Sequence, residues 1–82
     1  MAERAINRKW VIENLRETME HIESAIQGLK QGSDHALDTW IPFIYLDLNR
    51  AWNGRHIHDI ASVGGDNSLT QYPTDIDLSV PD

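Results

Sequence analysis

Apolar residues recur at helical spacing through the first third of the chain. Between residues 3 and 31 they are separated by alternating steps of three and four positions, and most positions between them are charged or carry amides. The apolar positions are Ile12, Leu15, Met19, Ile22, Ile26 and Leu29. This spacing predicts an amphipathic helix over about 3–31 with a heptad seam along one side. Gly32 is expected to end the helix as its carboxyl-terminal cap.

A second run with the same period predicts a helix over about 36–53. Its stripe consists of Leu37, Ile41, Ile44, Leu48 and Ala51. We expect this stripe to face the first helix, because each amphipathic helix must bury its apolar side. Pro42 is tolerated if it falls near the first turn. Gly54 should end the helix in the left-handed conformation that glycine accepts without steric cost.

The second helix is apolar around most of its girth, since Trp40, Phe43, Tyr45, Leu46 and Trp52 surround its stripe. One helix cannot cover so broad a surface, and aromatic residues are favoured at interfaces. The sequence therefore predicts a mainly α fold: an antiparallel helical hairpin with a short third element and a loosely ordered C-terminal tail, which dimerises into a helical bundle. The expected interface residues are Leu15, Met19, Ile22, Ile26, Trp40, Phe43, Ile44, Tyr45, Leu48 and Trp52. The alternative is that a third segment covers the aromatic residues within one chain.

The last third of the chain has a weaker pattern. Residues 55–63 suit a short helix or a strand, and residues 64–68 have the composition of a flexible joint. Ile76, Leu78 and Val80 alternate with polar residues, which indicates a strand if any regular structure forms. We therefore divide the chain into a helical domain, 1–63, and an acidic extended or disordered tail, 64–82, which should be dispensable for folding.

Composition narrows the function further. The chain has 82 residues, no cysteine and a net charge of −6, and residues 59–82 contain aspartates but no base. So short a chain buries only about 60% of its unfolded surface, and without cysteine a metal or a partner chain is left to add stability. An acidic end disfavours nucleic acid and suits a protein with a basic surface, or it simply keeps the tail soluble. Without a membrane-spanning run or signal-peptide features, the expected location is cytoplasmic, with no membrane partner.

One local cluster, His56, His58 and Asp59, has the character of a metal site. In a strand the two histidines would point to the same side and could chelate one ion, whereas in a helix they would diverge. The adjacent His58 and Asp59 resemble the metal-binding dyad of the HD phosphohydrolases. Those enzymes need further helices bearing more ligands, for which this chain has no room. The alternative is an exposed polar segment after the helix.

A second candidate metal site is the row Glu17, Glu20 and Glu23, whose spacing can hold magnesium. It resembles the first half of the site in all-α nucleotide pyrophosphatases, but the second acidic pair is missing, since Asp47 stands alone. The alternative is an ordinary solvated helix face. We therefore expect a non-enzymatic interaction or structural module without a cofactor, which homodimerises and binds a partner through its acidic tail. The competing hypothesis is a metal-dependent enzyme or metal-binding protein.

Overall fold

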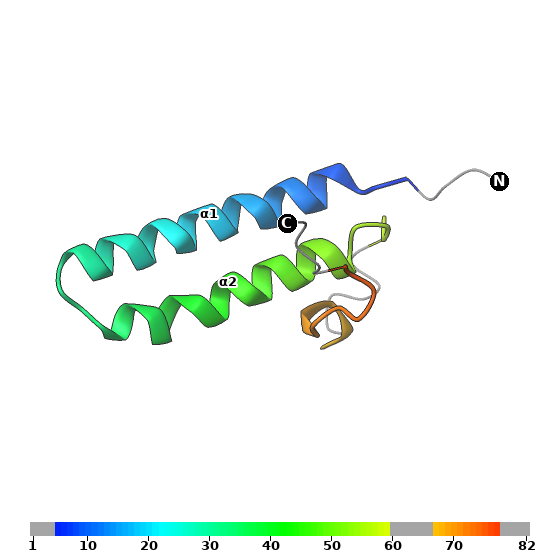
Figure 1. The fold of residues 1–82 in the computed structure, drawn as a ribbon. Coiled ribbons are helices and arrows are strands. Elements are labelled where there is room, and N and C mark those ends of the chain that lie inside the picture. Colours follow the sequence, from blue (N-terminus) through cyan, green and yellow to red (C-terminus); the bar gives the residue numbers. More distant parts are fainter. Residues whose placement is uncertain (1–4, 60–66, 78–82) are drawn as a thin grey trace, which may run out of the picture.

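The fold is a helical hairpin. A computed structural model describes residues 5–59 and 67–77. Helix α1 (Arg8–Lys30) and helix α2 (His35–Asn53) run antiparallel and pack side by side, and a 3-10 helix, η2 (Asn67–Thr70), lies against α2 (Figure 1). The described residues contain no strand, so the predicted mainly α hairpin is confirmed. No helix among them combines the length and the apolar character needed to cross a bilayer.

Helix α1 begins at Arg8, several residues later than the predicted start at residue 3. Asn7 is the reason, because its side-chain oxygen accepts a hydrogen bond from the Trp10 backbone N–H at 3.1 Å and so caps the helix. The Asn7 backbone N–H donates to the Arg55 carbonyl at 2.6 Å, and its side-chain amide donates to the Ile57 carbonyl at 2.8 Å. The start of α1 is thus tied to the chain that follows α2. We call this end of the hairpin the open end.

The other end, which we call the loop end, is a tight turn over residues 31–34. Gly32 has φ +87°, the left-handed conformation expected for a glycine cap. The backbone N–H of Gly32 donates to the Leu29 carbonyl and that of Ser33 to the Gly28 carbonyl, both at 3.0 Å. These two bonds form a Schellman motif, so Gly32 ends α1 as the sequence predicts.

Two expectations about α2 are wrong. The helix begins at His35, so Pro42 lies in its interior, where proline has no N–H to donate to the Asp38 carbonyl. Gly54 has φ −95°, which is not left-handed. A β-carbon at Gly54 would instead collide with the Trp10 indole, whose N–H donates to the Arg50 carbonyl at 2.8 Å. Glycine is needed there for space.

Small and polar residues form the contact between α1 and α2. The buried residues of the two helices are Asn14, Thr18 and Ala25 in α1 and Ala36, Asp47, Asn49 and Ala51 in α2. Near the loop end, a β-carbon added to Gly28 would lie 2.6 Å from the Ala36 β-carbon, so the two backbones approach closely there. Among the described residues, the buried hydrophobic ones are three alanines and Leu69. Within the described residues, the hairpin therefore closes without fully burying a large apolar side chain of α1 or α2.

The apolar stripes predicted to meet inside the hairpin point outward. Nine large apolar side chains of α1 and α2 are 36–68% exposed. They are Ile12, Leu15, Met19, Ile22, Ile26 and Leu29 in α1, and Leu37, Ile41 and Leu48 in α2. The expectation that the α2 stripe faces α1 is therefore wrong for these α2 residues, although Ala51 is buried and Ile44 is half-buried. Periodicity shows that a face must be covered, but it does not show by what.

Helical geometry places both stripes on the same side of the hairpin. In α1, Leu15 directly follows the buried Asn14, and in α2, Leu48 directly follows the buried Asp47. One residue is a rotation of about 100° around a helix. Because the helices are antiparallel, the two rotations lead to the same side, and Leu15 and Leu48 do line one groove. We call the nine exposed side chains together the apolar face.

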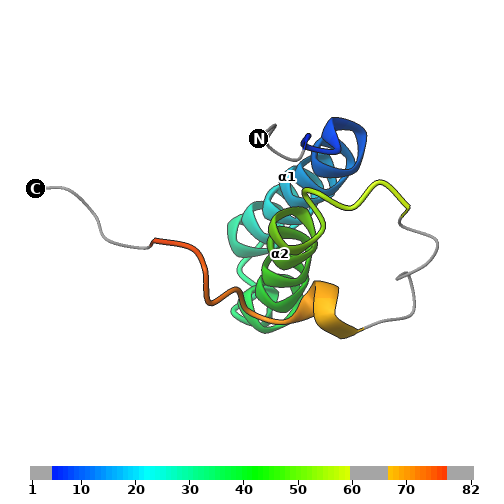
Figure 2. The same ribbon diagram turned by 90° about the vertical axis from the view of Figure 1, so that its right-hand side faces the viewer.

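The chain after the hairpin crosses α2. Seen from the open end, η2 lies on one side of α2 and the following residues pass to the other side (Figure 2). Leu69 of η2 is 5% exposed, and the side-chain amides of Asn49 and Asn53 donate to the carbonyls of Thr70 and Gln71 at 3.0 and 2.6 Å. We call residues 71–77 the strap. These contacts lead us to expect that truncating the chain before residue 67 would expose part of α2.

The predicted third element is only partly described. Residues 55–59 form a turn and bends, without a helix or strand, and residues 60–63 lie outside the described part of the chain. Ile76 is not in a strand, and Leu78 and Val80 also lie outside the described residues. The division of the chain at residue 64 stays a prediction.

Candidate interaction surface

A groove opens on the apolar face at the open end. It has a volume of about 420 Å³ and is lined by Ile6, Val11, Leu15, Leu48, Ala51, Trp52, Arg55 and Ile76. Residues of α1, α2 and the strap therefore share one apolar hollow. Ile76 is half-buried and Trp52 is half-buried, so neither is fully covered by its own chain. A concave, mostly apolar hollow is the usual form of a binding site.

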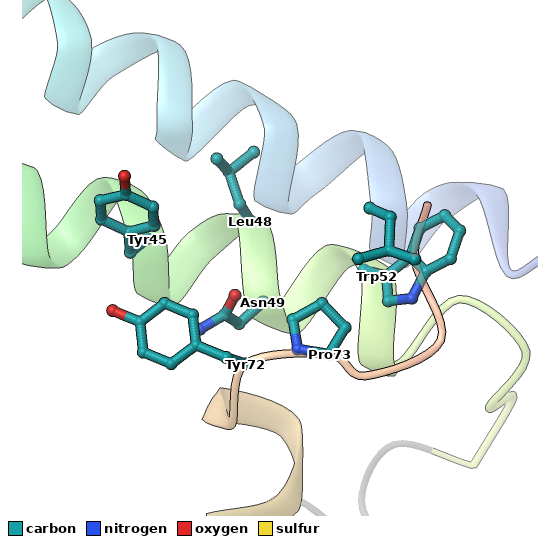
Figure 3. A pocket seen from close by; sticks show the side chains of 7 residues that line it. Tyr45, Leu48, Asn49, Trp52, Tyr72 and Pro73 are labelled. Carbon is teal, nitrogen blue, oxygen red and sulfur yellow. The ribbon is translucent and has the colours of Figure 1, made fainter. Parts of the chain in front are cut away.

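A smaller hollow of about 230 Å³ lies between α2 and the strap. Figure 3 shows Tyr45 on α2 and Tyr72 on the strap side by side, with Pro73 between Asn49 and Trp52. The two tyrosine rings meet edge to face with their centres 5.8 Å apart. Leu48, Trp52 and Ile76 line both hollows. The strap therefore helps to shape the groove on the apolar face.

The Asp75 carboxylate contributes a further contact between the strap and the end of α2. The Trp52 indole N–H donates to one Asp75 carboxylate oxygen at 2.8 Å, and Arg55 donates to the other at 3.2 Å. The Arg55 guanidinium lies 3.8 Å from the centre of the Trp52 ring, a cation–π contact. The hydrogen bond from Trp52, and then that from Arg55, lower the pKa of Asp75 below its ordinary value of 3.8. The charged form of Asp75 is thus the form that holds the strap.

We expect the Asp75 contacts to weaken only in strong acid. Because the pKa of Asp75 is lowered in the folded chain, its contribution to stability is present above pH 3.8 and is lost as the pH falls through the lowered pKa. A pH titration of the Trp52 indole N–H by NMR should therefore show a midpoint below 3.8, and Asp75→Asn should abolish that titration. A titration midpoint at or above pH 3.8 would mean that Trp52 and Arg55 do not hold the charged Asp75 carboxylate.

A hydrogen-bonded pair of a histidine and a buried aspartate lies between the helices. The His21 imidazole Nδ1 is 2.6 Å from an Asp47 carboxylate oxygen, and Asp47 is only 2% exposed. The rings of Trp40 and Phe43 lie 5.6 and 5.3 Å from that of His21. Since His21 belongs to α1 and Asp47 to α2, the pair fixes one register of the hairpin. A carboxylate also orients an imidazole in some catalytic sites. Here the rings of Trp40 and Phe43 pack against the imidazole, which fits a structural role.

Sequence reasoning missed this pair, because it treated Asp47 as a lone carboxylate. The available signal was their position. Asp47 stands one residue before Leu48 of the apolar stripe, and His21 one residue before Ile22. The residue before each apolar position is the one that faces the other helix. A histidine and an aspartate at equivalent places in two antiparallel helices can meet.

Among the described residues, the proposed metal ligands do not form a group of three. Glu17, Glu20 and Glu23 are all exposed on α1, and Glu23 accepts a hydrogen bond from Gln27 at 3.3 Å. A ring nitrogen of His56 and one of His58 lie 3.5 and 3.0 Å from the Ala5 carbonyl oxygen. Asp59 is exposed. Within residues 5–59 and 67–77, no three histidine or acidic side chains are grouped closely enough to hold an ion.

The predicted interface residues fall into three groups. Leu15, Met19, Ile22, Ile26 and Leu48 lie on the apolar face, and the half-buried Ile44 belongs to the same stripe. Trp40 and Phe43 contact His21 within the chain, while Tyr45 and Trp52 contact the strap.

Comparison with known proteins gives no further guide to this surface. No protein-family model, curated protein or solved structure matches the chain.

Proposed function

We propose that this protein is a non-enzymatic interaction module that forms a homodimer through the apolar face. Two hairpins pack face to face in this proposal and produce a four-helix bundle, whose core is the stripe of each α1 and α2. The dimer presents its polar surfaces, including the row Glu17, Glu20 and Glu23, to solvent and to other proteins. Trp40 and Phe43 already have partners within the chain, so the proposed interface does not depend on them.

One observation carries the proposal: the hairpin buries small and polar residues while its large apolar side chains stay exposed. Burying a leucine or isoleucine stabilises by about 1.5–3 kcal/mol, so a stable fold does not leave nine such side chains uncovered. Monomeric proteins rarely expose a contiguous apolar patch above a few hundred Å². Nine side chains that are about half exposed present on the order of 800 Å², the area each partner contributes to a standard interface.

A second copy of the chain is the simplest cover for this face. Twofold pairing buries the same patch on both chains and needs no other gene product. An anionic membrane surface is disfavoured, because the chain carries a net charge of −6 and amphipathic helices bind such surfaces through basic residues. The length of α1, 23 residues or about 35 Å, also suits the core of a four-helix bundle.

The acidic end is proposed as a second, weaker contact site for a protein with a basic surface. Its support is the run of aspartates without a base after residue 58. Asp75 is already engaged by Arg55 and Trp52, so it contributes less charge to such a partner. We therefore assign the main contact to the apolar face and a weaker one to the acidic end.

A native mass spectrum of the purified chain tests the proposal directly, because it reports subunit number and bound metal together. We expect twice the mass of the 9.4 kDa chain, with no added metal. A metal-loaded species that loses its ion in the double variant His56→Ala/His58→Ala would support the competing metal-binding hypothesis. A metal-free monomer would overturn both.

A further inference from the structure

We infer that the two hairpins of the dimer pack antiparallel, so that the loop end of each chain fills the groove at the open end of the other. The inference rests on the proposed homodimer and specifies which part of the second copy each site receives. Two observations support it independently. One is the unequal shape of the two ends of the apolar face, and the other is the unequal distribution of charge along the hairpin.

The open end of the apolar face is concave. The groove of about 420 Å³ lies between α1, α2 and the strap, with Leu15 and Leu48 on its walls. At this end the Trp10 indole lies between the helices, bonded to the Arg50 carbonyl and packed against Gly54. An aromatic ring between two helices prevents the close backbone approach that would close the groove. The space must be filled from outside the hairpin.

The loop end of the apolar face carries the side chains that could fill it. At Gly28 and Ala36 the two helices approach closely, with no large side chain between them. Leu29 and Leu37 flank this contact and are 44% and 47% exposed. Antiparallel pairing brings these leucines over the partner's groove. Parallel pairing would place groove against groove and leave the hollow at the open end unfilled.

Charge favours the same arrangement. We divide the hairpin at the middle of its helices and compare residues 19–45, the loop half, with residues 8–18 and 46–55, the open half. The loop half holds four acids, Glu20, Glu23, Asp34 and Asp38, and one base, Lys30, for a net charge of −3. The open half holds five bases, Arg8, Lys9, Arg16, Arg50 and Arg55, and three acids, Glu13, Glu17 and Asp47, for a net charge of +2.

Antiparallel pairing brings the loop half of one chain, with a net charge of −3, to the open half of the other, whose helical residues have a net charge of +2, at both ends of the bundle. Parallel pairing would bring the two loop halves together, and like charges repel across an interface. Asp59, Asp75 and Asp77 also belong to the open end and change its net charge to −1. Among residues 5–59 and 67–77, the loop half is the more negative of the two. The antiparallel arrangement therefore still separates the most strongly repelling surfaces.

The absence of cysteine allows a direct distance measurement. A single spin label at Gln31→Cys marks the exposed turn at the loop end, and one at Glu20→Cys marks an exposed position near the middle of α1. In the antiparallel dimer the two Gln31 labels lie at opposite ends of the bundle, about 35 Å or more apart, from the length of α1. In the parallel dimer they lie at the same end, within roughly 25 Å, since packed helices are 8–10 Å apart.

The Glu20 label distinguishes a dimer with the wrong orientation from the absence of a dimer. It lies near the middle of the bundle and should give a distance clearly shorter than that between Gln31 labels. Sedimentation equilibrium on both labelled variants checks that they remain dimers. A short Gln31 distance in a dimer would overturn the antiparallel arrangement and leave the dimer intact. Monomers in both variants and in the unmodified chain would overturn the proposed homodimer as well.

Discussion

Replacing Ile22 with aspartate is expected to convert the proposed dimer into monomers that are largely unfolded. Ile22 lies near the middle of the apolar face and is 41% exposed in the single chain. In the proposed bundle, a carboxylate at this position would be buried without a partner, at a cost of several kcal/mol in each chain. Every 1.4 kcal/mol weakens association about tenfold, so the dissociation constant should rise at least about 100-fold. Sedimentation equilibrium at micromolar concentration measures the change.

Gln27→Asp is the matched control for Ile22→Asp. It introduces the same charge into the same helix, at an exposed position outside the apolar face. Its expected cost is a few tenths of a kcal/mol, from repulsion with Glu23 one turn away. Equal effects of the two substitutions would mean that the apolar face is not a buried core. A well-folded monomer of the unmodified chain would rule out the dimer altogether.

The sequence predicted the two helices better than it predicted their contact. Periodic leucines and isoleucines identify α1 and α2 within a few residues, because an amphipathic stripe has to be covered by something. The same stripe does not show which surface packs against it. We expected Leu37 and Ile41 to face α1, but the hairpin closes instead along Ala25, Gly28 and Ala36, whose small side chains permit close approach.

Features that depend on contacts distant in the sequence were the hardest to predict. Gly54 looked like a left-handed cap, yet it leaves room for the Trp10 indole, which comes from 44 residues earlier in the chain. The position of η2 on α2 depends on asparagine side chains that donate to backbone carbonyls of residues 68–71. Neither the Gly54–Trp10 contact nor the asparagine hydrogen bonds leave a periodic pattern in the sequence. Local patterns could therefore suggest the interaction surface but not the strap that shapes its groove.

The strongest test of the hairpin itself, separate from the dimer, is removal of His21. In His21→Ala the Asp47 carboxylate, which is 2% exposed in the intact chain, loses its hydrogen-bond partner, and leaving a buried polar group without a partner costs about 1–3 kcal/mol or more. Asp47→Ala should cost less, because the His21 side chain is 25% exposed and can form a hydrogen bond with water instead. Urea unfolding at fixed protein concentration measures both changes.

Two further variants decide whether the pair acts as we infer. His35→Ala is the matched control, because the His35 side chain is 93% exposed and its contact with Asp38 is a surface one, so its removal should cost under about 1 kcal/mol. Replacing both partners, His21→Leu with Asp47→Leu, should restore most of the lost stability, since an apolar pair needs no charge compensation. If His21→Ala unfolds at the same urea concentration as His35→Ala, the pair does not hold the helices in register. If the double replacement is as unstable as His21→Ala, the loss comes from packing rather than from an uncompensated charge.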